Sequence, residues 1–132
     1  ETPRDLDSHL IGNKPDGNGF NVFYSNMRYV WNDKEMAYLD VDDTTSYGPE
    51  TITIFEPING WVYAVHDFSN RSYTDSKNIS YSGAYVTVYT GGKQVATFNI
   101  PVGEVGTYWT VFEYVDGQIR PINVVNNIAP TP

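Results

Sequence analysis

The chain has 132 residues, no cysteine, 16 acidic and 8 basic residues, and a net charge of −8 at pH 7. Without cysteine it has no disulfide scaffold, no catalytic thiol and no zinc site built on thiolates, and its acidity disfavours binding to nucleic acid or to an anionic membrane. The length indicates a single domain, and no apolar run is long enough to span a membrane.

The first predicted strand is acidic and has the sequence Asp5-Leu6-Asp7-Ser8-His9-Leu10. Neighbouring residues of a strand point to opposite faces, so we expect Asp5, Asp7 and His9 to share one face. Two carboxylates on one face repel each other unless a cation or a hydrogen-bond donor lies between them. The pattern therefore favours a bound cation or a network of donors at this strand.

Alternating runs along the rest of the chain predict further strands. They cover residues 20–25, 36–41, 51–55, 60–66, 84–89, 94–100, 108–112 and 118–124. Turns at Gly91-Gly92 and Asp116-Gly117 separate alternating runs and predict tight hairpins. We expect at most one helical turn, within residues 27–35, and a long surface loop over residues 68–82.

This pattern predicts an all-β fold, an antiparallel β-sandwich of about eight strands with jelly-roll or immunoglobulin-like character. We expect one sandwich module over residues 1–125. Residues 126–132 contain two prolines and read as a C-terminal linker or tail.

A second acidic segment, Asp40-Val41-Asp42-Asp43, ends a predicted strand, and Glu50 begins the next one. Ca²⁺ binds about six to eight oxygen ligands from carboxylates, carbonyls and water, so two such segments would suit a structural calcium ion if they meet in space. The candidate ligands are Asp5, Asp7, Asp40, Asp42, Asp43 and Glu50. The alternative is that these carboxylates are solvated charges at turns and strand ends.

The chain has two histidines, His9 and His66. Both of them with a carboxylate would make a zinc set, but their spacing does not indicate one. We expect His9 to make an oriented hydrogen bond within the first acidic segment and His66 to end a strand beside Asp67.

Aromatic residues make up 15% of the chain and raise the question of a sugar-binding surface. Alternation leaves Tyr85 and Tyr89 facing outward from their strand, and Trp31 lies among polar residues that favour a loop. Exposed rings stack on the apolar faces of sugars, so Trp31, Tyr85 and Tyr89 are the candidate ligand-binding residues. The alternative is that aromatic residues pack inside the sandwich, as we expect for Trp61 and Trp109.

Several motifs resemble, in their order, those of the bacterial YfaP-type domains over residues 5–123. These motifs are Asp5-Leu6-Asp7-Ser8-His9-Leu10, Val22-Phe23-Tyr24-Ser25-Asn26, Asp40-Val41-Asp42-Asp43, Tyr47-Gly48-Pro49-Glu50, Thr51-Ile52-Thr53-Ile54 and Tyr108-Trp109-Thr110-Val111-Phe112. The resemblance implies a β-sandwich that serves as an accessory module of exported, multidomain bacterial proteins.

One feature of those domains is a further strand ending in Trp-Gly ahead of the position of Glu1, which this sequence lacks. The resemblance therefore predicts either a missing N-terminal strand or an edge closed by residues 122–128. A looser similarity, to the calcium-binding sandwiches that follow secreted bacterial peptidases, rests on the Asp-x-Asp pair at a strand start. It adds to the case for calcium.

No nucleophile elbow, metalloprotease helix or phosphate-binding loop is present, so we expect no enzyme. The leading hypothesis is a non-catalytic, extracellular or cell-surface accessory module that binds carbohydrate and holds a structural calcium ion. We expect other domains of the same parent chain as partners, but no nucleic acid and no membrane insertion. The alternative is a structural or adhesive spacer domain of a bacterial surface protein that binds a protein partner.

Overall fold

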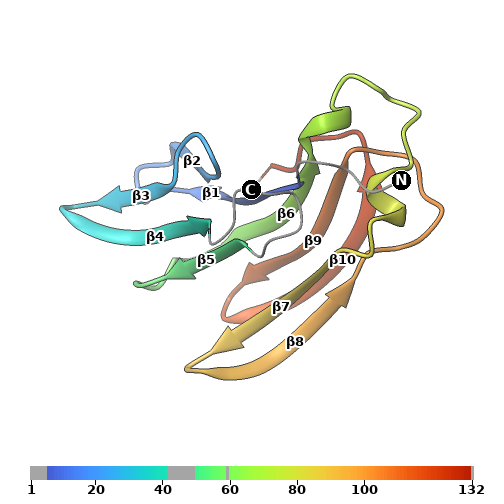
Figure 1. Cartoon of the computed structure of the whole chain (residues 1–132). Helices are drawn as coiled ribbons and strands as arrows, with labels where there is room; N and C mark the ends of the chain where they lie inside the picture. The colour runs from blue at the N-terminus through green and yellow to red at the C-terminus, as the bar shows by residue number, and fades with distance from the viewer. Residues whose placement is uncertain (1–5, 42–49, 59, 132) are drawn as a thin grey trace.

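Ten antiparallel strands build the protein in a computed structural model that describes residues 6–41, 50–58 and 60–131 (Figure 1). The larger sheet has five strands in the order β10-β9-β6-β1-β2. Their bounds are β1 Leu6–Asn13, β2 Gly19–Val22, β6 Trp61–Asp67, β9 Tyr108–Val115 and β10 Gln118–Asn126. The first strand of the chain is therefore an interior strand of this sheet, with β2 on one side and β6 on the other.

The remaining strands form two smaller sheets against the larger one. A three-stranded sheet has the order β3-β4-β5, and β7 pairs with β8 as a separate hairpin. Their bounds are β3 Arg28–Trp31, β4 Lys34–Val41, β5 Glu50–Ile54, β7 Tyr85–Thr90 and β8 Lys93–Asn99. This arrangement confirms the all-β, antiparallel, sandwich-like fold, with ten described strands where about eight were expected.

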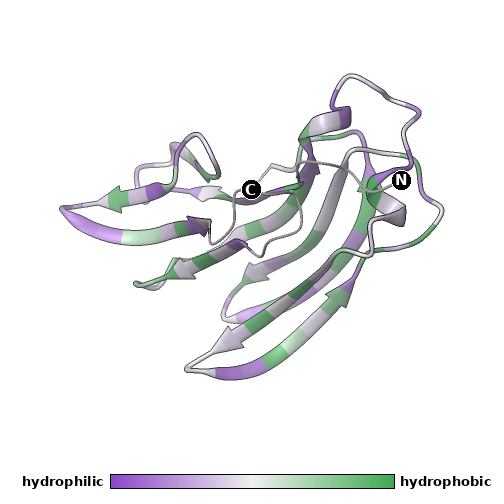
Figure 2. Ribbon diagram, in the orientation of Figure 1, coloured by the Kyte–Doolittle hydropathy of each residue, from purple (hydrophilic) through white to green (hydrophobic). Residues whose placement is uncertain are grey.

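The core lies between the larger sheet and the two smaller ones. Leu10 on β1, Leu39 on β4 and Trp109 on β9 are almost completely buried in one hydrophobic cluster. Between the layers, the ring of Phe98 on β8 stacks on that of Phe112 on β9 with 5.3 Å between centroids. Figure 2 shows the corresponding alternation of hydrophobic and hydrophilic residues along the strands.

Two-residue turns close three hairpins. Gly91-Gly92 has φ values of 58° and 80° and Asp116-Gly117 of 53° and 75°, the left-handed pairs that fit the twist of a tight hairpin, and both predicted turns are confirmed. A third such turn, Asn32-Asp33 with φ of 52° and 61°, joins β3 to β4. Residues 27–35 thus hold a hairpin and no helical turn, because two consecutive left-handed residues reverse the chain.

The predicted surface loop, residues 68–82, contains two short 3-10 helices, η1 Phe68–Asn70 and η2 Ile79–Tyr81. It is not wholly a surface segment, because Ile79 and Ser80 are fully buried. The Ser80 hydroxyl donates to the Pro101 carbonyl and accepts the Glu104 N–H at 2.9 Å. These bonds tie the segment to the connection between β8 and β9.

The residues that follow β10 contact the rest of the protein. The Asn127 side-chain amide donates to the Thr74 carbonyl at 2.8 Å. Residues 128–131, with side chains of β6, β9 and β10, line an open groove of about 310 Å³. Within the described ranges, no helix has the length and apolar character needed to cross a membrane.

Candidate functional site

The first acidic segment contacts Glu50 where β1 and β5 begin. The Ser8 N–H donates to Glu50 Oε1 at 2.9 Å, which ties the start of β5 to the edge of β1. On the core side of β1, the hydroxyls of Ser8 and Tyr63 lie 2.6 Å apart in a hydrogen bond. The pKa of Tyr63 is raised to about 12. Burial is the main cause, the nearby Glu50 charge also raises the pKa, and the Ser8 hydrogen bond acts in the opposite direction.

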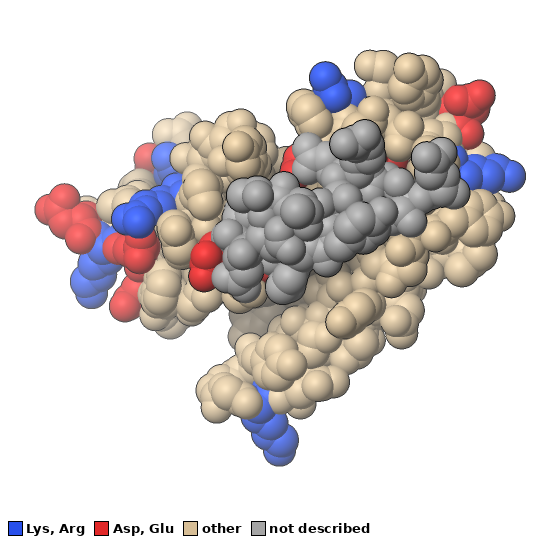
Figure 3. All heavy atoms as spheres, in the orientation of Figure 1, with Lys and Arg blue, Asp and Glu red and all other residues tan. Residues whose placement is uncertain are grey.

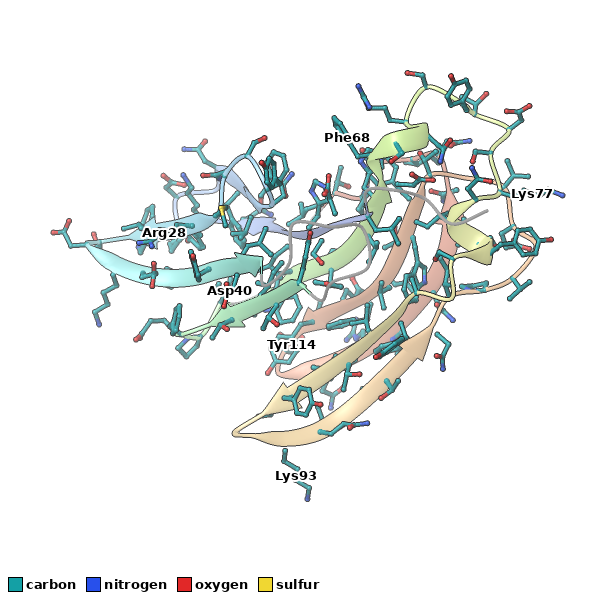
Figure 4. The ribbon with its side chains drawn as sticks, in the orientation of Figure 1. Arg28, Asp40, Phe68, Lys77, Lys93 and Tyr114 are labelled. Carbon is teal, nitrogen blue, oxygen red and sulfur yellow. The ribbon has the colours of Figure 1, made fainter. Side chains whose placement is uncertain are left out.

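The described members of the predicted calcium set point in different directions. Asp7 pairs in register with His66 and is buried on the face of the larger sheet that lies away from the core. The Glu50 side chain lies beside the backbone of β1. Asp40 is exposed on β4, where it is adjacent to Val41, the residue that pairs with Glu50 (Figure 4). Because adjacent strand positions face opposite ways, Asp40 and Glu50 lie on opposite faces of the smaller sheet.

Three further predicted ligands, Asp5, Asp42 and Asp43, lie outside the described residues. Within residues 6–41, 50–58 and 60–131, no three acidic or histidine side chains are grouped as a metal site would require. The structure thus joins the first acidic segment to Glu50 by a hydrogen bond, but it does not gather Asp7, Asp40 and Glu50 around one point.

The two histidines lie together on the outer face of the larger sheet. Their ring centroids are 6.0 Å apart in an edge-to-face contact. His9 also stacks on Phe23 at 4.9 Å, and His66 stacks on Tyr108 at 4.0 Å. This row was missed by sequence reasoning, since it requires the register of β1 against β6, which places Asp7 opposite His66 and His9 opposite Ala64.

His9 makes an oriented hydrogen bond as expected, but its partner lies on β2 and not within the first acidic segment. His9 Nδ1 lies 3.1 Å from Asn21 Oδ1, in a hydrogen bond that fixes the ring. His66 and Asp67 are the last two residues of β6. Asp67 is the N-cap of η1, and both of its carboxylate oxygens accept hydrogen bonds from Asn70.

Acidification should destabilise the protein through His9. Burial, which outweighs the hydrogen bond to Asn21, lowers the pKa of His9 from its ordinary 6.5. Below pH 6.5 the unfolded chain therefore protonates His9 more readily than the folded protein does. The free energy of unfolding falls as the pH drops through the lowered pKa of His9 in the folded state. Urea unfolding above and below that pH measures the loss.

The matched variant is His9→Gln, which places a hydrogen-bonding amide at the site and removes the titrating ring. Carboxylates contribute to the pH dependence of both proteins, so the difference between the two isolates His9. We expect the variant to lose less stability on acidification than the wild type. Equal losses in the two proteins would contradict this role of His9.

The candidate sugar-binding residues of β7 lie on its outer face. Tyr85 is 69% exposed and Tyr89 62% exposed, whereas Val86 and Val88, which alternate with them, pack against the core. Residues opposite Tyr85, Thr87 and Tyr89 on β8 are Asn99, Thr97 and Gln94. Gln94 Nε2 donates to Thr97 Oγ1 at 2.8 Å, so these polar side chains form a row beside the tyrosines.

Trp31 does not join this surface. It ends β3 in the three-stranded sheet, where it is half-buried against the core and does not lie in a loop. Figure 1 shows the β3–β4 hairpin well apart from β7–β8. The other two tryptophans are core residues as expected, with Trp61 at 9% exposure and Trp109 at 0%.

Comparison of the chain with models of known protein families, with curated proteins and with solved structures gave no match.

Proposed function

We propose that the protein is a non-catalytic, extracellular or cell-surface accessory module that binds carbohydrate through the outer face of the β7–β8 hairpin. The observation that carries the proposal is the exposure of Tyr85 and Tyr89 on one strand face, beside the polar row of β8. The resemblance to YfaP-type domains supports the extracellular setting, and the lack of catalytic motifs supports a binding role.

The chemistry of this face suits a sugar. Aromatic rings stack on the apolar faces of pyranose rings, and hydroxyl and amide groups beside them bond to the sugar hydroxyls. Single exposed apolar residues are common and need no function. Here, however, two tyrosines project in the same direction from a rigid, paired strand whose other face is anchored in the core, which reduces the entropy lost on binding.

Removing either tyrosine should weaken glycan binding. For Tyr85→Ala and Tyr89→Ala we expect each dissociation constant to rise about tenfold, which corresponds to about 1.4 kcal/mol and is usual for a buried aromatic contact. Isothermal titration against a panel of soluble polysaccharides measures this. The matched control is Tyr73→Ala, because Tyr73 is 61% exposed but lies in the segment between η1 and η2. Absence of heat with every glycan would refute the proposal.

The proposal includes a structural calcium ion near the start of β5. Its support is the hydrogen bond from Ser8 to Glu50, which holds the Glu50 carboxylate beside the first acidic segment. Carboxylate oxygens are among the ligands that a hard cation such as Ca²⁺ prefers. Of the described candidates, Glu50 is the one at this junction.

Calcium should raise the thermal midpoint by several degrees relative to excess chelator at one ionic strength. An ion bound only by the folded state, at about 100 times its dissociation constant, adds about 2.7 kcal/mol. Glu50→Gln, which can still accept from Ser8, should reduce the shift. Asp40→Asn is the control, because Asp40 faces the other side of its sheet. The same midpoint with calcium and chelator would eliminate the ion.

The second candidate function is a structural or adhesive spacer that binds a protein partner. It is favoured by the described sheet pairings, in which β5 pairs with β4 alone and β7 pairs with β8 alone. Each strand has one edge that pairs with no other described strand, where an added strand could bind through backbone hydrogen bonds. A spacer would be indifferent to sugars, so the glycan titration separates the two functions.

A further inference from the structure

The outer face of the β7–β8 hairpin is almost free of charge. Between Asn78 and Gly103 the sequence has a single charged residue, Lys93, although the protein has a net charge of −8. Figure 3 shows this hairpin without acidic side chains and with one blue group, and Figure 4 places Lys93 at the tip, pointing away from the strands. A charged ligand would lose its hydration on this face and gain few ionic contacts in return. The face therefore suits an uncharged ligand.

A shallow groove of about 320 Å³ extends this face at its other end. Its lining includes Tyr81, Gly83, Asn99 and Val102. Tyr81 and Val102 are largely exposed there. Asn99 lies opposite Tyr85 in the hairpin register, so the groove begins where the row of tyrosines ends.

The dimensions of the combined surface require an extended ligand. Tyr85 and Tyr89 are four residues apart on one strand, which places them about 13 Å apart along its axis. The groove beside Tyr81 adds to that length. A single sugar ring can stack on one tyrosine at a time, so a ligand that contacts both rings and the groove must be a chain lying along β7.

We propose that this surface binds an uncharged, unbranched polysaccharide, which stacks on Tyr89 and Tyr85 and continues into the groove between Tyr81 and Asn99. Thr87, Thr97 and Gln94 meet the hydroxyl edges of the sugar rings. This inference rests on the proposed carbohydrate-binding function and adds to it the class of glycan, the direction of the chain and a second contact region.

The experiment is a calorimetric titration with neutral oligosaccharides of glucose, xylose and mannose, from disaccharide to hexasaccharide, with oligogalacturonates as the charged series. We expect affinity for a neutral series to rise about tenfold with length, and the charged series to bind at least about tenfold more weakly. Tyr81→Ala and Asn99→Ala should remove most of the gain in affinity between disaccharide and hexasaccharide. Tyr73→Ala should match the wild type.

The possible failures are distinguishable. Equal affinity for disaccharide and hexasaccharide, with binding still lost in Tyr85→Ala, would overturn the extended chain and leave the carbohydrate-binding function intact. Preference for oligogalacturonates would overturn the uncharged class alone. No binding of any series by a wild type that unfolds cooperatively would overturn this inference and the proposed function together.

Discussion

Replacing Trp109 with alanine should lower the free energy of unfolding by about 3 to 5 kcal/mol. Trp109 is fully buried in the core, on β9, which lies between β6 and β10 in the larger sheet. Its indole N–H donates to Asn123 Oδ1 at 2.7 Å, so the substitution removes a hydrogen bond as well as the largest fully buried side chain. Because small domains are stable by about 5 to 15 kcal/mol, the variant will be close to unfolding.

Urea unfolding followed by far-ultraviolet circular dichroism measures this loss. Two further variants separate its causes. Trp109→Phe keeps most of the ring and removes the N–H donor, so we expect a smaller loss of about 1 to 2 kcal/mol. Trp31→Ala removes a half-buried ring and should also lose less than Trp109→Ala. A loss below about 1 kcal/mol for Trp109→Ala would mean that this part of the core collapses around the cavity.

Replacing Gly106 with alanine should destabilise the protein by about 2 to 5 kcal/mol. Gly106 has φ of 152°, and an added Cβ would lie 2.5 Å from the Cα and carbonyl carbon of Asn126. Neither atom can move freely, because the Asn126 carbonyl accepts the Thr107 N–H at 3.1 Å. The added methyl group would push the entry to β9 away from the end of β10.

Thermal and urea unfolding of Gly106→Ala and Gly103→Ala test this packing. Gly103 also has a positive φ, 84°, but its Cβ would meet no atom closer than 3.8 Å, the Tyr81 hydroxyl. Gly103→Ala therefore isolates the backbone strain, about 1 kcal/mol, from the clash. Similar losses in the two variants would show that the contact with Asn126 yields easily.

The sequence predicts the strands and turns that depend on local pattern. Alternation located the strands of the larger sheet, and the Gly91-Gly92 and Asp116-Gly117 pairs located two hairpins. The β3–β4 hairpin was missed because Asn32 and Asp33 carry no glycine, although asparagine and aspartate tolerate left-handed backbone better than other residues. The burial of Ile79 within a polar segment also left no periodic signal.

The candidate sites divide in the same way. The outward direction of Tyr85 and Tyr89 follows from alternation within one strand and is confirmed. Contacts between distant segments do not follow from alternation, since they depend on strand register. The ring contact between His9 and His66 and the bond between Ser8 and Glu50 are of this kind. The groove beside Tyr81 likewise requires the fold, because it joins η2 to the end of β8.

The interior position of β1 determines how the chain must fold. The β3–β4, β7–β8 and β9–β10 hairpins each join neighbouring segments and can form in microseconds. Leu10, however, pairs with Tyr63, so β1 waits for a strand made much later in synthesis. Until β6 has been synthesised, one edge of β1 has no strand to pair with. A nascent chain released before that point would expose the unpaired backbone groups of this edge to other chains, which favours aggregation.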